Sequence, residues 1–362
     1  MTDAGQALPG VGHPGRILYR ESNAPDPEED HLPGLNRLSV LGCGRWGSFH
    51  LWYGAGLDLE VTGWEPAGSE PFALLERERR NRYLVLPDGV RLTNDLDEAL
   101  DTDLLIIATP SRELAGICGL LSGRDLCRTH VILCMKGLET GTGRRLSQVF
   151  LGSGIEPLSL SAWVGPGHPV LLVSGQPTCM LIASEDDSAS ALLVERLGSR
   201  LVRLYRSRDL AGCEIGAAAK NVIGIAAGIL DGLGWQGLKG ALMARAPVEV
   251  ARLASATGGD WRSIYGLAHL GDYEATLFSE QSRNRLRGEC LATGRPYTEG
   301  LAEGVEACAA LLLLAARTGV EMPITSAVGM VLDGRVAPRA AIEELFDRPL
   351  KEEFPSPQSF VR

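Results

Sequence analysis

Two lysines stand where an ammonium group could meet a small charged substrate. Lys136 follows the short apolar run from Val131 to Met135, which we expect to be a buried strand of a parallel sheet. Ligands bind beyond the carboxyl ends of such strands, so a cation there is well placed to meet an anion or a carbonyl group. An ordinary surface lysine at a strand end is equally compatible with this position.

Lys220 and Asn221 lie in a different setting, the stretch of small apolar residues from Ile215 to Leu233. Burying a lysine among such residues is costly unless the lysine is paired or functional. Burial would also lower its pKa towards the working pH, which suits a general acid or base, whereas the alternative is a lysine whose charged end reaches solvent. The stretch is long enough to cross a membrane, but its lysine, glycines and alanines favour a packed core helix without stable membrane insertion.

A glycine-rich turn, Gly42-Cys43-Gly44-Arg45-Trp46-Gly47, fits the pattern G-x-G-x-x-G. It follows an expected strand and opens an expected helix, which is the context of a dinucleotide-binding turn. Glu65 ends the next strand, where an acidic residue meets the ribose 2′-hydroxyl of the adenosine. A carboxylate there would repel the extra phosphate of NADP, so we predict that NAD is preferred, with NADP possible.

A polar run, Ser279 to Arg285, follows the segment Gly271 to Thr276. A guanidinium group in such a run can hold a phosphate bidentately, with amide and hydroxyl groups beside it. Taken alone, the run is more typical of a solvated loop.

Composition excludes several classes of protein. The chain has 362 residues, of which 45% are hydrophobic, too many for a disordered chain. Its formal net charge of -10 argues against a general nucleic-acid binder but leaves a small anionic substrate possible. The eight cysteines are scattered without a CxxC pair, which predicts no metal site and a cytoplasmic location.

The elements that must position these residues are strands alternating with helices in the first part of the chain and helices alone in the second. We predict strands at 38–41, 59–64, 90–92, 104–108, 131–134, 161–164, 179–183 and 201–204, with helices such as 70–80 and 113–121 between them. Later helices are predicted at 214–230, 239–257, 296–318 and 324–332. The fold class is therefore an α/β Rossmann-type doubly wound, parallel sheet domain (37–207) followed by an all-α C-terminal domain (208–354), with disordered tails at 1–36 and 355–362.

Taken in order, the motifs GxGxWG, MKGLE, AAKNVIGIAAGILDGLG, LGDYEAT and SRNR resemble the NAD(P)-dependent sn-glycerol-3-phosphate dehydrogenase family, in its bacterial branch. The likeness runs from about Arg37 to Glu353 and includes a helix end similar to E-R-x-N-x-x-Y-L. It implies hydride transfer between the nicotinamide and the central carbon of dihydroxyacetone phosphate, in a homodimer without a metal.

The resemblance also implies roles for particular residues. Lys220 is the acid or base at the ketone oxygen, Lys136 polarises or orients that oxygen, and Asp272 helps to organise the site. The other substrate-binding residues implied are Asn221, Thr276, Arg283 and Asn284, the last two at the phosphate. The cofactor-binding residues implied are Gly42, Gly44, Arg45, Trp46, Gly47, Glu65, Pro110 and Glu303.

Two segments depart from the family pattern. The loop 165–171 lacks the expected Ser or Thr, Phe and Glu, and its His168 is either an extra acid or base or an ordinary loop residue. The segment 235–239 is shorter by one residue and lacks an Asn. Two alternatives therefore stay open: a related dehydrogenase acting on another phosphorylated or carboxylated hydroxy compound, and a weakly catalytic NAD-binding regulatory protein.

Overall fold

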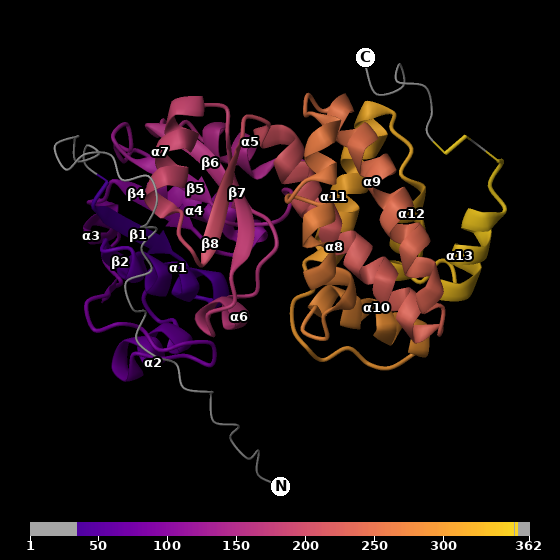
Figure 1. Ribbon diagram of the computed structural model, residues 1–362, viewed down its shortest axis with the longest axis horizontal. Helices are drawn as coiled ribbons and strands as arrows, with labels where there is room; N and C mark the ends of the chain where they lie inside the picture. The colour runs from indigo at the N-terminus through magenta and orange to yellow at the C-terminus, as the bar shows by residue number, and fades with distance from the viewer. Residues whose placement is uncertain (1–34, 351, 354–362) are drawn as a thin grey trace, which may run out of the picture.

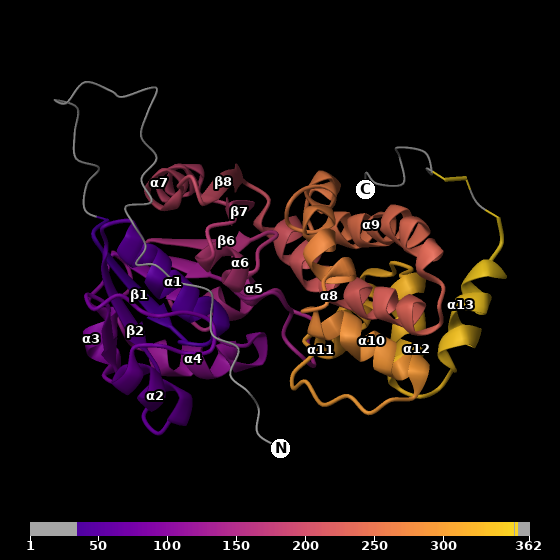
Figure 2. The same ribbon diagram turned by 60° about the horizontal axis from the view of Figure 1, so that its bottom comes forward.

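The computed structural model describes residues 35–350 and 352–353, which form a sheet part and a helical part side by side (Figures 1 and 2). Most of the predicted tail 1–36 and all of the predicted tail 355–362 lie outside the described residues. Leu35 is buried and the backbone N–H of Asn36 donates to the Asp103 carboxylate, so these two residues belong to the folded body.

The sheet part contains all eight predicted strands, with ends shifted by a few residues. They are β1 (Arg37–Leu41), β2 (Glu60–Trp64), β3 (Arg91–Thr93), β4 (Leu104–Ile107), β5 (His130–Leu133), β6 (Ser159–Val164), β7 (Thr178–Ser184) and β8 (Val202–Ser207). Their order is β3-β2-β1-β4-β5-β6-β7-β8. The order reverses between β1 and β4, and this switch point is where doubly wound sheets bind dinucleotides.

Helices cover both faces of the sheet. They are α1 (Arg45–Gly56), α2 (Glu70–Glu78), α3 (Leu96–Leu100), α4 (Leu114–Leu121), α5 (Leu146–Leu151), α6 (Pro169–Val173) and α7 (Asp187–Leu197). Leu104 and Ile106 of β4 share a core with α1, α6 and α7, while Leu105 and Ile107 share another with α3, α4 and α5. This alternation confirms the doubly wound fold.

The prediction of a wholly parallel sheet is wrong at one pair of strands. β6 and β7 run antiparallel, with Ser161 opposite Ser184, whereas the other pairs in the described sheet are parallel. The connecting helix α6 has five residues and therefore spans only about 7.5 Å. The chain passes from β6 to β7 through residues 165–177, and β7 then enters the sheet in the opposite direction.

The helical part is built around α8 (Leu210–Gly232), which packs against α9 (Lys239–Ala256), α10 (Arg283–Thr293), α11 (Gly304–Thr318) and α12 (Pro323–Leu332). A last helix, α13 (Pro338–Phe346), packs on α12. The helix predicted at 296–318 begins only at Gly304, because Gly300 has a φ of +76°, outside the helical range. Neither α10 nor α13 is among the predicted helices, and the run read as loop-like becomes the start of α10.

Small residues let α8 lie unusually close to its neighbours. A Cβ atom at Gly228 would stand 1.7 Å from the Arg285 carbonyl oxygen, and one at Gly288 would stand 2.0 Å from that of Ile225. The most apolar window of α8 is long enough to cross a membrane, yet 94% of it is buried inside the protein. This burial accounts for the glycine and alanine content of the helix without a membrane.

Candidate active site

Both predicted lysines meet one carboxylate at the junction of the two parts. Lys136 lies just beyond β5, Lys220 lies on α8, and Asp272 ends a short turn, Leu270–Asp272. The Asp272 Oδ2 atom lies 2.8 Å from Lys136 Nζ and 2.7 Å from Lys220 Nζ. Asp272 is 1% exposed, so a single buried oxygen holds two ammonium groups. We call Lys136, Lys220 and Asp272 the Asp272 cluster.

Thr276 supports this cluster from a one-turn π-helix, Glu274–Phe278, a local widening that often marks functional sites. Its hydroxyl accepts a hydrogen bond from Lys220 Nζ over 3.1 Å and donates to the Asp272 carbonyl over 2.7 Å. Burial lowers the pKa of Lys220 to about 8, against the opposing attraction of Asp272. The Lys220 side chain is therefore able to change between ammonium and amine near neutral pH.

The Asp272 cluster carries more positive charge than its carboxylate neutralises. The second oxygen, Asp272 Oδ1, is buried and has no hydrogen-bond partner in the part of the chain that the structure describes. Glu303 lies beside the start of α11, and burial raises its pKa. The positive charges of Lys220 and Lys136 oppose this rise. Within the described residues, no group of His, Cys, Asp and Glu side chains is arranged to hold a metal. The site therefore suits an anionic substrate or an oxygen that gains negative charge.

Asn221 and Asn284 link the elements that carry the cluster. Asn221 Nδ2 donates to the Lys136 carbonyl over 3.2 Å, and Asn284 Nδ2 donates to Asn221 Oδ1 over 3.0 Å. Asn284 Oδ1 in turn accepts from the Gly304 N–H over 2.9 Å. The chain of amides therefore joins the end of β5 to α8, α10 and α11.

Arg283 is the first residue of α10. Its Nη1 atom lies 3.4 Å from the Leu301 carbonyl oxygen, and it forms no ion pair within the described residues. Its charge, like that of both lysines, also opposes the rise that burial causes in the pKa of Glu303. The guanidinium is thus close to the Asp272 cluster and has capacity left for an anion.

The glycine turn has the shape that a dinucleotide requires. Gly42 has a φ of +95°, and a Cβ there would stand 2.9 Å from the Thr109 side chain. A Cβ at Gly47 would stand 1.6 Å from the Gly42 carbonyl oxygen, so this glycine lets α1 pack closely. A Cβ at Gly44 would meet nothing within 4 Å, and no side chain caps α1. The start of α1 therefore offers open space and free N–H groups for a pyrophosphate.

The residues around this turn connect it to the lysines. Glu65 Oε1 accepts the Cys43 N–H over 2.7 Å, and burial raises the pKa of that carboxyl. The Trp46 ring centre lies 5.7 Å from Lys136 Nζ, and Arg45 lies over the Tyr83 ring. Pro110 precedes the short helix Ser111–Glu113 at the end of β4, across the switch point from the glycine turn. The predicted cofactor and substrate residues therefore adjoin.

The divergent loop 165–171 lies against both lysines. Lys136 Nζ donates to the Gly165 carbonyl over 2.8 Å. His168 Nε2 donates to the Ala275 carbonyl over 3.2 Å, and burial lowers the pKa of His168. A neutral imidazole that donates its N–H to a backbone carbonyl has no proton to give to a substrate. This contact therefore favours a structural role for His168 over a role as an extra acid. A Cβ at Gly167 would stand 3.0 Å from Trp46, so a larger residue there would displace the ring.

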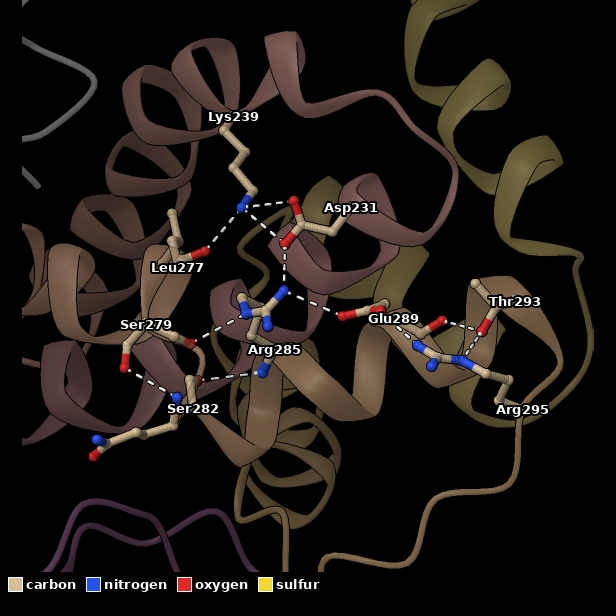
Figure 3. A network of polar contacts seen from close by, with 10 residues as sticks. Asp231, Lys239, Leu277, Ser279, Ser282, Arg285, Glu289, Thr293 and Arg295 are labelled. Carbon is tan, nitrogen blue, oxygen red and sulfur yellow. Dashed lines mark hydrogen bonds and ion pairs between the residues drawn. The ribbon is translucent and has the colours of Figure 1, made fainter.

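The second divergent segment, 235–239, lies elsewhere. Its Lys239 belongs to a buried network at the far end of α8, which Figure 3 shows and which sequence reasoning missed. A cavity of about 620 Å³ is also remote from the chemistry, since it lies among α8, α9, α12 and α13 and none of the predicted site residues lines it.

Comparisons with known proteins cover both parts of the chain. Residues 37–190 match the family model described as NAD-dependent glycerol-3-phosphate dehydrogenase N-terminus, and residues 209–343 match the corresponding C-terminus. A protein of Methylibium petroleiphilum named glycerol-3-phosphate dehydrogenase (NAD(P)+) is 39% identical over 342 residues, which are 89% of this chain and 99% of the relative. One of Prosthecochloris aestuarii with the same name is 36% identical over 331 residues, covering 87% of this chain and 99% of the relative.

Solved structures agree with these sequence matches. The crystal structure of glycerol-3-phosphate dehydrogenase from Coxiella burnetii matches with a TM-score of 0.80 and 28% identity, covering 86% of this chain and 99% of that one. A structure of D-mandelate dehydrogenase with NADH matches at a TM-score of 0.56 and 16% identity, which shows a shared fold alone.

Proposed function

The chain belongs to the NAD-dependent glycerol-3-phosphate dehydrogenase family, and from this membership we propose how its own residues carry out the reaction. It is an NAD(P)-dependent oxidoreductase that interconverts dihydroxyacetone phosphate and sn-glycerol 3-phosphate. The observation that carries the residue assignment is the pair of lysines on one Asp272 oxygen, next to a glycine turn shaped for a dinucleotide.

Lys220 is the proton donor in the direction of ketone reduction. Reduction places negative charge on the ketone oxygen, and bound NADH supplies the hydride. An ammonium with a pKa of about 8 can protonate that oxygen near neutral pH, and its amine form can take the proton back in the reverse direction. Lys136 stabilises the same charge without having to transfer its proton.

Asp272 and Thr276 hold Lys220 in place for this transfer. The carboxylate keeps both lysines in one position, and the Thr276 hydroxyl fixes the direction of Lys220 Nζ. Because Thr276 donates to a backbone carbonyl, its oxygen is free to accept from the lysine. The third proton of the Lys220 ammonium is left to face the substrate oxygen.

Arg283 and Asn284 hold the substrate phosphate. Arg283 stands at the start of α10, where the helix dipole also favours an anion, and it has no carboxylate partner within the described residues. Asn221 and Asn284 support the arrangement through their amide chain. Binding energy from the phosphate would orient the carbonyl towards Lys220.

The glycine turn holds the cofactor. Gly42, Gly44 and Gly47 shape the turn, and the N–H groups at the start of α1 would bind the pyrophosphate. The side chains that adjoin it in this assignment are Arg45, Trp46, Glu65, Pro110 and Glu303. The Glu65 carboxylate beside the turn supports a preference for NAD over NADP.

The family resemblance further supports a homodimer. All eight cysteines are unpaired, which agrees with a reducing compartment, and we infer a cytoplasmic location.

The test is an assay of cofactor oxidation with dihydroxyacetone phosphate, run with NADH and NADPH side by side. Rapid loss of NADH absorbance is expected. If turnover occurs only with the ketone that corresponds to a different hydroxy compound, the chain is a related dehydrogenase. Binding of NADH without turnover on any ketone would indicate a regulatory protein.

A further inference from the structure

A second buried group of charges lies where α8, α9 and α10 meet (Figure 3). Asp231 receives Lys239 Nζ at 2.8 Å and Arg285 Nη1 at 2.8 Å, and Arg285 also reaches Glu289 at 3.2 Å. The side chains of Asp231, Lys239 and Arg285 are between 9% and 14% exposed. We call these four residues the Asp231 cluster.

The two cations of this cluster also hold backbone carbonyls. Lys239 Nζ donates to the Leu277 carbonyl over 2.9 Å, and Arg285 Nε donates to the Ser279 carbonyl over 3.1 Å. Both carbonyls belong to one stretch of chain, residues 277–282, so Asp231 is the shared partner of the two groups that fix this stretch. Figure 3 shows the carbonyls of Leu277 and Ser279 turned towards the cations.

The position of this stretch matters because of what it joins. It is preceded by Thr276, which bonds Lys220, and followed by Arg283, the proposed phosphate ligand. A movement of residues 277–282 would therefore change the distance between the proton-transfer site and the phosphate site.

Asp231 itself cannot touch the substrate at the lysines. It lies eleven positions after Lys220 on α8, which corresponds to about 16 Å along the helix axis. The ion pairs of its side chain within the described residues are to the cations of its own cluster. Any effect of Asp231 on the reaction must pass through the chain segment that its partners hold.

We propose that Asp231 is a positioning residue for substrate phosphate: through Lys239 and Arg285 it fixes residues 277–282, and so the place of Arg283 relative to Lys220. The proposal rests on the proposed role of Arg283. It assigns a function to the segment 235–239, whose Lys239 supplies one of the two anchors.

The principal variant is Asp231→Asn, which keeps the shape of the side chain but removes its charge. Lys239 and Arg285 would lose their shared counter-ion and shift, and the 277–282 stretch would loosen with them. We expect the KM for dihydroxyacetone phosphate to rise roughly ten- to a hundredfold, because small misplacements of binding groups are costly. The KM for NADH should stay unchanged and kcat should fall by less than about threefold.

Arg285→Lys is the second variant, needed if Asp231→Asn does not fold. It keeps a cation beside Asp231 but lacks the planar fork that reaches Ser279, so the same rise in KM is expected, to a smaller extent. Arg295→Gln is the matched control. Arg295 is 57% exposed and bonds Glu289 at the outer edge of the network, so its loss should leave all three parameters unchanged.

Inhibition by inorganic phosphate separates positioning from general destabilisation. Competitive inhibition against dihydroxyacetone phosphate should weaken in parallel with the rise in KM, in variants whose melting curves show them to be folded. Unchanged KM and unchanged phosphate inhibition in folded Asp231→Asn would overturn the proposal, as would an equal loss for NADH. Arg283→Ala is run beside it: no effect there would refute the phosphate assignment itself, whereas an effect there alone would refute only the positioning role.

Discussion

Two aspartates of the helical part each hold two cations, yet their surroundings differ. Asp272 receives Lys136 and Lys220 on one oxygen and leaves its other oxygen buried without a partner. Asp231 receives Lys239 and Arg285, and these cations also bind two carbonyls and Glu289.

The two clusters differ in how completely carboxylates and hydrogen bonds balance their cations. In the Asp231 cluster two cations face two carboxylates, and backbone oxygens take further donors, which is the condition for a stable buried network. In the Asp272 cluster two cations face one carboxylate, and burial lowers the pKa of Lys220. The first arrangement is suited to holding chain segments, and the second is suited to stabilising charge that arrives with a reacting substrate.

The largest expected effect comes from Lys220→Met. The variant removes the proton donor while keeping a long apolar side chain in the buried position. We expect kcat to fall by about a thousandfold or more, since positioned acids contribute on this scale. Binding of NADH, measured by fluorescence titration, should be preserved because the glycine turn is intact. Near-normal turnover would remove Lys220 from its role and with it the contrast between the two clusters.

Arg283→Ala is expected to act mainly on binding. Loss of a charged hydrogen bond to phosphate costs about 1.5 to 3 kcal/mol, which corresponds to a rise in KM of roughly ten- to a hundredfold. The KM for dihydroxyacetone phosphate should rise in steady-state kinetics while the KM for NADH does not. An unchanged KM would contradict the phosphate assignment and leave the Asp231 cluster with nothing to position.

Much of the fold could be predicted from local pattern. Short apolar runs marked strands such as β1, β4, β5 and β6, because buried strands leave that signature. The direction of β7 could not be read in this way, since an apolar run carries no strand direction and the alternation of strands with helices predicts parallel pairs. The helix α10 was missed for a related reason: its polar first turn, from Arg283, resembles a loop until its packing against α8 is known.

The residues of the candidate site likewise fall into those that local sequence pattern could predict and those that it could not. Lys220 could be singled out because a lysine among small apolar residues is conspicuous, and Lys136 because it follows a strand. The Asp231 cluster could not, because its members come from three helices and two of its partners are backbone carbonyls, which carry no residue-type signal. The single cue was Lys239, which ends the divergent segment 235–239.

The pH dependence tests whether the low pKa belongs to the working lysine. With a pKa of about 8, Lys220 is an ammonium below that pH and a neutral amine above it. Reduction of dihydroxyacetone phosphate needs the ammonium, so kcat/KM should fall about tenfold per unit as pH rises well above 8. Oxidation of sn-glycerol 3-phosphate needs the amine and should fall as pH drops below 8. A reduction rate that stays flat to high pH would show that another group supplies the proton.

The smallest effect is expected at a third carboxylate, Glu65, which accepts the Cys43 backbone N–H and not a cation. Its charge would face the ribose of the cofactor, where it repels the additional phosphate of NADPH. Glu65→Gln keeps an oxygen for the Cys43 N–H and removes the charge. We expect the ratio of kcat/KM for NADH over NADPH to fall by about tenfold, mainly through better use of NADPH.

A matched control is Glu70→Gln, at the exposed start of α2, which removes one negative charge from the same part of the molecule. If it changes the ratio as much as Glu65→Gln does, net charge and not the local carboxylate governs cofactor choice. If the unmodified enzyme already favours NADPH, the carboxylate at Glu65 does not select the cofactor. If only Glu65→Gln shifts the ratio, then one uncompensated carboxylate repels a phosphate in the cofactor site, whereas the two paired aspartates hold cations in place.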